Sequence, residues 1–80
     1  MDIATEKKMM EFMQPLFGDM ARKTIENQKE KLKLTKGELS YDQYVQIVKS
    51  IKDLCLKMAG AAVANKVEQG LMQILEAEKS

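Results

Sequence analysis

Leu34-Thr35-Lys36-Gly37-Glu38-Leu39-Ser40 is the stretch of this 80-residue chain that carries the most signals for a turn between two helices. Gly37 suits the left-handed residue that closes a helix. Ser40 is a favourable N-cap, and Gln43, three residues later, completes a capping box. We therefore predict a turn over residues 34–40, with one helix before it and another after it.

Upstream of this turn, Pro15 is expected to interrupt the helical pattern. Inside a helix a proline ring collides with the carbonyl group four residues earlier and removes one hydrogen bond, whereas proline is tolerated at the first helical position. We predict a short helix over residues 3–13, a break, and a second helix over residues 15–33. A single kinked helix is the alternative.

Downstream of the turn, apolar residues recur at three-four spacing, which predicts one long helix over residues 41–77. Gly60 could break this helix, but alanines surround it and no Ser, Thr, Asp or Asn stands ready to cap a new helix. A single interior glycine costs only about 1 kcal/mol relative to alanine. We favour a continuous helix, in which Gly60 and Ala64 would allow a close helix crossing.

These elements predict an all-α chain that forms a single domain: a helical hairpin with a short N-terminal helix and a long C-terminal helix. A helix over residues 41–77 would be roughly 55 Å long. A globule of this chain length has a radius of gyration of only about 12 Å. Because the shorter arm could not cover such a helix, we expect a homodimer in which two hairpins build a helical bundle.

The composition argues against several classes of function. The chain has no His and one Cys, so it lacks an imidazole base, an intrachain disulfide and the usual ligands of zinc. We expect no enzyme activity, no cofactor and no metal, and we expect Cys55 to be an inert core residue. The net charge is +1, and no stretch resembles a signal peptide or a membrane span. We expect a cytoplasmic protein.

The first quarter of the chain contains five of the seven methionines. Methionine is flexible and polarizable, so these residues could grip a partner helix, although their helical spacing equally suits an ordinary core. We predict a protein–protein interaction module, such as an adaptor, a regulatory subunit or an accessory subunit. The candidate partner or dimer interface comprises apolar and small residues on the expected helix faces: Met9, Met13, Leu16, Phe17, Met20, Ile47, Ile51, Leu54, Met58, Gly60, Ala64, Val67, Leu71 and Ile74.

Two alternatives remain open. Basic residues near the predicted turn could bind nucleic acid or another polyanion, but we rank this below a protein partner because only one of the six basic residues over 22–36 is Arg. The candidate polyanion contacts are Lys29, Lys31, Lys33, Lys36, Lys49 and Lys52. The second alternative is a small apolar ligand pocket between the Met-rich helices.

Overall fold

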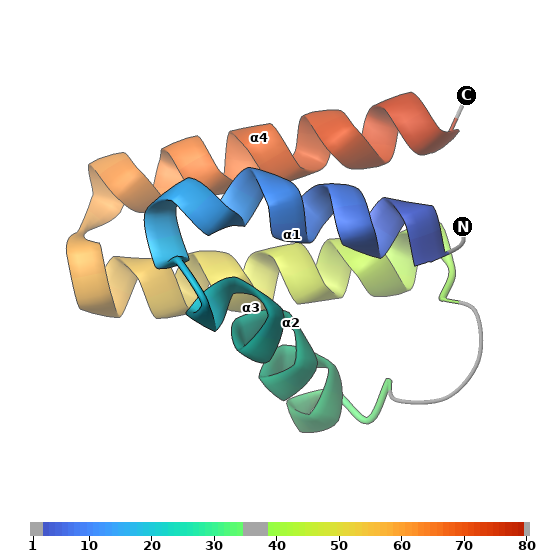
Figure 1. The fold of residues 1–80 in the computed structure, drawn as a ribbon, viewed down its shortest axis with the longest axis horizontal. Coiled ribbons are helices and arrows are strands. Elements are labelled where there is room, and N and C mark those ends of the chain that lie inside the picture. The colour runs from blue at the N-terminus through green and yellow to red at the C-terminus, as the bar shows by residue number, and fades with distance from the viewer. Residues whose placement is uncertain (1–2, 35–38, 80) are drawn as a thin grey trace.

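The computed structural model describes residues 3–34 and 39–79, and these residues form four α-helices (Figure 1). The helices are α1 (Ile3–Phe17), α2 (Met20–Lys31), α3 (Tyr41–Ala59) and α4 (Ala61–Lys79). No strand occurs over these described residues, which confirms the all-α class. The molecule measures 31 × 25 × 21 Å, so helices of 19 residues run along nearly its full length.

The four helices contact one another in a ring. Helices α3 and α4 form an antiparallel hairpin with the most extensive contact between any two helices of the described chain. Helix α1 lies beside α4 and runs in the opposite direction, and α2 leaves the end of α1 to pack against α3 (Figure 1). The contacts therefore run from α1 to α4, α3, α2 and back to α1.

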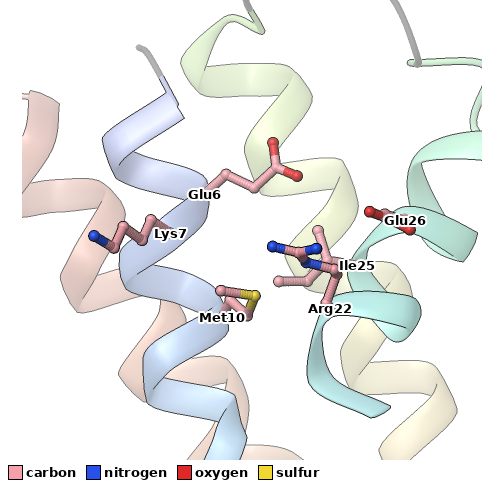
Figure 2. A pocket seen from close by; sticks show the side chains of 6 residues that line it. All are labelled: Glu6, Lys7, Met10, Arg22, Ile25 and Glu26. Atoms are coloured by element: carbon pink, nitrogen blue, oxygen red, sulfur yellow. The ribbon is translucent and has the colours of Figure 1, made fainter. Parts of the chain in front are cut away.

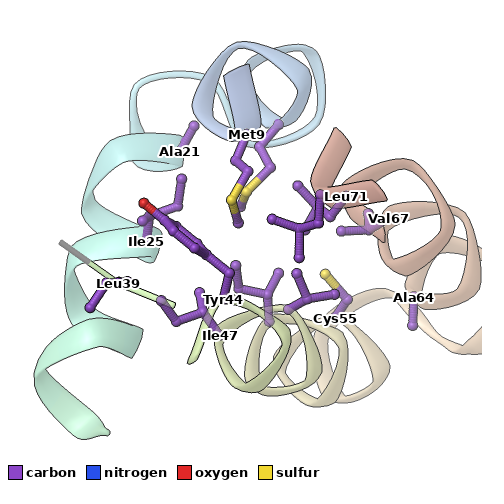
Figure 3. Packing of buried hydrophobic residues seen from close by; sticks show 14 residues of the cluster. Met9, Ala21, Ile25, Leu39, Tyr44, Ile47, Cys55, Ala64, Val67 and Leu71 are labelled. Carbon is purple, nitrogen blue, oxygen red and sulfur yellow. The ribbon is translucent and has the colours of Figure 1, made fainter. Parts of the chain in front are cut away.

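The hydrophobic core fills the inside of this ring (Figure 3). Each helix contributes one face to it, at the three-four spacing that the apolar pattern of the sequence indicates. The buried apolar side chains are Met9 and Met13 of α1, Ala21 and Ile25 of α2, Leu39 before α3, Tyr44, Ile47, Val48, Ile51 and Cys55 of α3, and Ala64, Val67, Leu71 and Leu75 of α4.

Two helices precede residue 34, as predicted, but the break expected at Pro15 is misplaced, because α1 does not end there. Helix α1 passes through Pro15 to Phe17, and the break falls at Gly18, where φ is +60°. The ring of Pro15 meets the carbonyl group of Glu11 one turn earlier, so its cost is confined to one lost hydrogen bond in the last turns of α1. Gly18 adopts the left-handed conformation without the cost that a Cβ would bring.

Helix α2 also ends earlier than expected, in a Schellman motif. Lys33 has a φ of +61° and its N–H donates to the carbonyl oxygen of Glu30 at 3.0 Å, while the N–H of Leu34 donates to that of Lys29 at 2.8 Å. The left-handed residue after α2 is thus Lys33. The glycine expected in this role, Gly37, lies outside the described residues.

The predicted capping box at the start of α3 is confirmed. The Ser40 hydroxyl accepts a hydrogen bond from the Gln43 N–H at 3.2 Å, and the Gln43 side-chain oxygen accepts one from the Ser40 N–H at 2.8 Å. Two N–H groups that a helix start leaves without partners are satisfied within four residues of chain. Local sequence therefore specifies where α3 begins.

The predicted continuous helix over residues 41–77 is wrong, because the chain turns back at Gly60. This residue has φ of +91° and ψ of 175°, a region that is essentially open only to glycine. The turn lets α4 lie along α3 and bury Val67 and Leu71 within the same chain. Burying such side chains outweighs the loss of a few helical hydrogen bonds at the turn. The apolar face of α3 is thus covered by its own chain, and the need for a second subunit to cover a long helix disappears.

Candidate functional site

Half of the predicted interface lies in the core of the single chain. The fully buried members are Met9, Met13, Ile47, Ile51, Ala64, Val67 and Leu71. Three others, Phe17, Leu54 and Ile74, are half-buried, and Gly60 forms the α3–α4 turn. The remaining three, Leu16, Met20 and Met58, are exposed to solvent.

Among the residues that the structure describes, the exposed large apolar side chains lie at one end of the bundle. Leu16 and Met20 flank the α1–α2 turn, and Leu56 and Met58 lie in the last turn of α3. Figure 1 shows that the α1–α2 and α3–α4 turns are at the same end of the molecule. The exposed fractions of the four side chains are 56% for Leu16, 53% for Met20, 42% for Leu56 and 70% for Met58. We call Leu16, Met20 and Met58, together with half-buried Phe17, the turn-end surface, because Leu56, two residues from Met58, lies on another side of α3.

The turn-end surface continues the apolar faces that build the core. In α3, Met58 follows Ile51 and Cys55 at three-four spacing, and both of these earlier residues are buried. In α1, Leu16 follows buried Met13 three residues later. The same faces that pack inside the ring therefore run out beyond the helices that cover them. A cluster of exposed apolar residues is a recognised property of interaction sites.

Positive charges accompany this surface along the chain. Lys57 precedes Met58, and Arg22 and Lys23 follow Met20 by two and three residues. All three side chains are exposed, and the one acidic neighbour at the turn is exposed Asp19. Arg22 also lines the α1–α2 groove together with Glu6 and Glu26, so Lys23 and Lys57, against Asp19, leave a small excess of positive charge beside the turn-end surface.

Leu56 was not among the predicted interface residues. It stands outside the three-four seam of α3, between half-buried Leu54 and exposed Met58. A leucine off the apolar seam of an amphipathic helix was the available signal, because such a position is expected to face solvent.

A groove of about 350 Å³ lies between α1 and α2 (Figure 2). Met10 and Ile25 provide its apolar lining, and Glu6, Lys7, Arg22 and Glu26 provide its charged lining. The Lys29 ammonium group ties the two helices together through an ion pair with Glu6, at 3.0 Å. Charged residues outnumber apolar ones along the groove, but most of the surface that it exposes is apolar, so the small apolar ligand stays an alternative.

A second hollow, of about 300 Å³, lies between α1 and α4. Here the Phe12 ring lies against Gly70, and a Cβ atom at Gly70 would overlap that ring. Lys8 and Glu78, which also line the hollow, form an ion pair between the two helices. The glycine that permits a close helix approach is thus Gly70, whereas the sequence pattern predicts Gly60 in that role.

The predicted polyanion contacts are partly neutralised. Lys29 pairs with Glu6, and Lys52 pairs with Glu68 at 3.0 Å. Lys31, Lys33 and Lys49 are exposed, and Lys36 lies outside the described residues. Two of the six lysines would have to give up a carboxylate before contacting a phosphate, which weakens the case for this alternative.

The titratable groups with shifted pKa values support structural roles. Burial raises the pKa of the Cys55 thiol, whose residue is only 2% exposed, so Cys55 stays protonated and inaccessible. A hydrogen bond from the Tyr41 hydroxyl to Glu76 raises the pKa of Tyr41 and joins the start of α3 to the end of α4. Within residues 3–34 and 39–79, His, Cys, Asp and Glu form no group of three that could hold a metal ion.

The described helices include none with the length and apolar character that a membrane span requires. Comparison of the chain with known protein families, with curated protein sequences and with solved structures found no match.

Proposed function

We propose that the chain is a small helical protein–protein interaction module, an adaptor or accessory subunit, that binds its partner through the turn-end surface. The supporting observation is that the core-forming faces of α1 and α3 continue into exposed Leu16 and Met58 at one end of the bundle, where exposed Met20 begins α2. Methionine side chains adapt their shape to a partner at low cost, which suits such a role. A reducing cytoplasm is the proposed setting, because the one cysteine is a buried free thiol.

The proposed partner is an amphipathic helix that carries acidic residues beside its apolar face. Exposed Lys57, Arg22 and Lys23 accompany the surface, so acidic flanks would complement it. A second copy docking the same surface would bring these like charges together, which disfavours self-association there. An amphipathic helix binds through apolar residues at positions i, i+3, i+4 and i+7, which line up along one of its faces.

The test uses two synthetic helical peptides with the same leucine face, one flanked by Glu and the other by Lys. Each is titrated into the labelled protein and followed by amide chemical shifts. The acidic peptide is expected to saturate and to shift residues around both turns, and the basic peptide to bind about tenfold more weakly or less. If neither peptide shifts these residues, or both bind equally, the proposed partner chemistry is wrong.

Two sets of variants separate the apolar and charged contributions. M20Q combined with M58Q removes exposed apolar surface without adding charge and is expected to abolish binding of the acidic peptide. K57Q is expected to weaken binding, whereas K31Q, an exposed lysine at the C-terminal end of α2, serves as the matched control and is expected to leave it unchanged. Unchanged binding by the double methionine variant would overturn the proposal.

A further inference from the structure

The connection between α3 and α4 is a single residue, Gly60. Its N–H donates to the carbonyl oxygen of Cys55 at 3.2 Å, and its own carbonyl oxygen accepts from the N–H of Ala64 at 3.1 Å. Gly60 is therefore the last cap of α3 and the first of α4 at once. Its exposed neighbours Ala59 and Ala61 belong to the residue type with the highest helix propensity. The residues on both sides of the turn thus favour helix strongly.

A change at this one residue would join the two helices. If Gly60 adopted helical φ and ψ, residues 41–79 would form one helix about 58 Å long. The last carbonyl groups of α3 and the first N–H groups of α4 lack helical partners at the turn, and Gly60 has no side chain to cap them. In the fused helix these groups would bond to one another. This gain offsets the small penalty of one interior glycine, so little local free energy separates the bent from the straight form.

The bent form is stabilised by contacts between α4 and the rest of the chain. Val67, Leu71 and Leu75 of α4 are fully buried, and Lys52 of α3 pairs with Glu68 of α4. A straightened monomer would expose all of these apolar residues to water. A second straightened copy could bury these residues again through the same contacts. In each chain, the surface that its own α4 had covered would be free to receive the α4 of the other copy. Short hinges of this kind favour the exchange of identical elements between copies.

We propose that the chain exchanges α4 with a second copy of itself, with Gly60 as the hinge, to form a domain-swapped dimer. Each protomer of this dimer contains a continuous α3–α4 helix, and its α4 packs on the α1 and α3 helices of the partner subunit. The proposal does not depend on the turn-end surface as a partner site. The partner is a second copy of the chain, because the contacts that α4 makes in the monomer are the ones that it makes in the dimer.

The principal test compares the wild type with two hinge variants by size-exclusion chromatography with light scattering. A Cβ atom at position 60 would meet no other atom within 4 Å, but the φ of +91° strains any residue with a Cβ atom. Gly60→Ala therefore disfavours the turn, whereas alanine fits the straight helix. We expect this variant to be mainly dimeric, at twice the 9.1 kDa of one chain. A variant in which Gly60 is replaced by the longer flexible linker Gly-Asn-Gly-Asn-Gly is expected to remain monomeric. The wild type is expected to give a dimer fraction that rises with protein concentration.

Zero-length carbodiimide cross-linking then distinguishes a swapped dimer from an ordinary one. Equal amounts of ¹⁴N and ¹⁵N chains are unfolded, refolded together and cross-linked, and the joined peptides are analysed by mass spectrometry. In a swapped dimer the Lys52–Glu68 pair lies between chains, so about half of its cross-linked peptides carry both isotopes by random pairing. The Lys29–Glu6 pair joins α1 to α2 and stays within one chain in either form, which makes it the internal control.

Three results would overturn the proposal. In one, Gly60→Ala stays monomeric and folded. In another, it dimerises but yields Lys52–Glu68 peptides of one isotope only, which identifies a dimer without exchange. If Gly60→Ala fails to fold, the wild type decides the question. A wild-type chain that stays monomeric and gives no mixed-isotope peptides after refolding at millimolar concentration would then refute the exchange.

Discussion

The two helical hairpins of this chain, α1–α2 and α3–α4, both turn at a glycine with positive φ, yet they pack differently. In the α3–α4 hairpin the helices lie along each other, and α3 and α4 supply most of the fully buried side chains. In the α1–α2 hairpin the helices diverge after Gly18 and leave a groove of about 350 Å³ bridged by the Glu6–Lys29 ion pair. The turn alone therefore does not determine how two helices pack.

The difference follows from what lies on the facing surfaces. Helix α4 presents Ala64, Val67, Leu71 and Leu75 to the core, so small and branched side chains repeat along one face. Helix α2 is strongly polar and buries only two apolar side chains, Ala21 and Ile25, beside Thr24 and Gln28. We infer that α3–α4 provides most of the stability of the bundle, while α1–α2 is held by fewer and weaker contacts.

The largest expected effect comes from truncating the core of the α3–α4 hairpin. Ile51 is fully buried, so Ile51→Ala removes packing and leaves a cavity at a cost of about 2–5 kcal/mol. Met10→Ala at the α1–α2 groove shortens a half-buried side chain and is expected to cost about 1 kcal/mol or less. The midpoint of urea unfolding followed by circular dichroism measures both.

Because Ile51→Ala could unfold so small a domain, Ile51→Val serves as a milder variant, with an expected cost of about 0.5–1.5 kcal/mol. Equal destabilisation by the Ile51 and Met10 variants would show that the two hairpins contribute equally to stability.

The second effect concerns the α1–α2 turn. Gly18 has a φ of +60°, and a Cβ atom at this position would meet no other atom within 4 Å. Gly18→Ala therefore meets only the backbone cost of the left-handed region, about 1–2 kcal/mol. Gly18→Asn is expected to cost less, because asparagine visits this region more readily. Thermal unfolding midpoints compare the two variants, and an alanine variant as stable as the wild type would show that the turn relaxes to another conformation.

The third prediction compares the stability lost when the N-cap side chain of α2 or of α3 is removed. Ser40 makes a complete capping box, so Ser40→Ala is expected to cost about 1 kcal/mol. Asp19 occupies the N-cap of α2 without a side-chain capping bond, so Asp19→Ala removes only its interaction with the helix dipole, about 0.3–1 kcal/mol at low salt. Urea unfolding in 1 M salt, where the dipole term is screened, should leave only the Ser40 effect. A large Asp19 effect under these conditions would indicate a capping bond in solution.

The smallest effect comes from the ion pair across the α1–α2 groove. The Lys29 and Glu6 side chains are 21% and 27% exposed, so solvent screens the pair and Glu6→Gln is expected to cost about 0.2–1 kcal/mol. The cost should fall further in 1 M salt. Glu11→Gln, an exposed position on the same helix, is the control. If the two variants were indistinguishable at low salt, the ion pair would contribute nothing to the packing of α1 on α2.

Several parts of the fold could be predicted because they depend on residues close together in the chain. The capping box needs only Ser40 and Gln43, and the buried face of α3 follows from the spacing of Tyr44, Ile47 and Ile51. The end of α2 was misplaced although it is equally local. The left-handed residue there is Lys33, and nothing in its residue type favours this conformation over that of a nearby glycine.

The candidate site was predictable only in part, for a related reason. Three-four spacing identifies the residues on the apolar face of a helix, but it does not show whether the same chain covers that face. Met13 and Leu16 have equivalent patterns, yet Met13 is fully buried and Leu16 is 56% exposed. The difference depends on how far along α1 its neighbouring helices extend, which is decided by the arrangement of all four helices.

The local order of the residues was enough to establish an all-α chain, the start of α3 and the buried faces of its helices. The tertiary structure decided whether residues 41–79 form one helix or two, and hence whether the apolar face of α3 is covered by its own chain. The physical reason is that the local conformational cost at Gly60 is small compared with the free energy gained by burying apolar side chains. Gly60 costs little in either a helix or a turn, so contacts between residues far apart in the sequence, such as those that bury Ile51 and Leu71, determine the result.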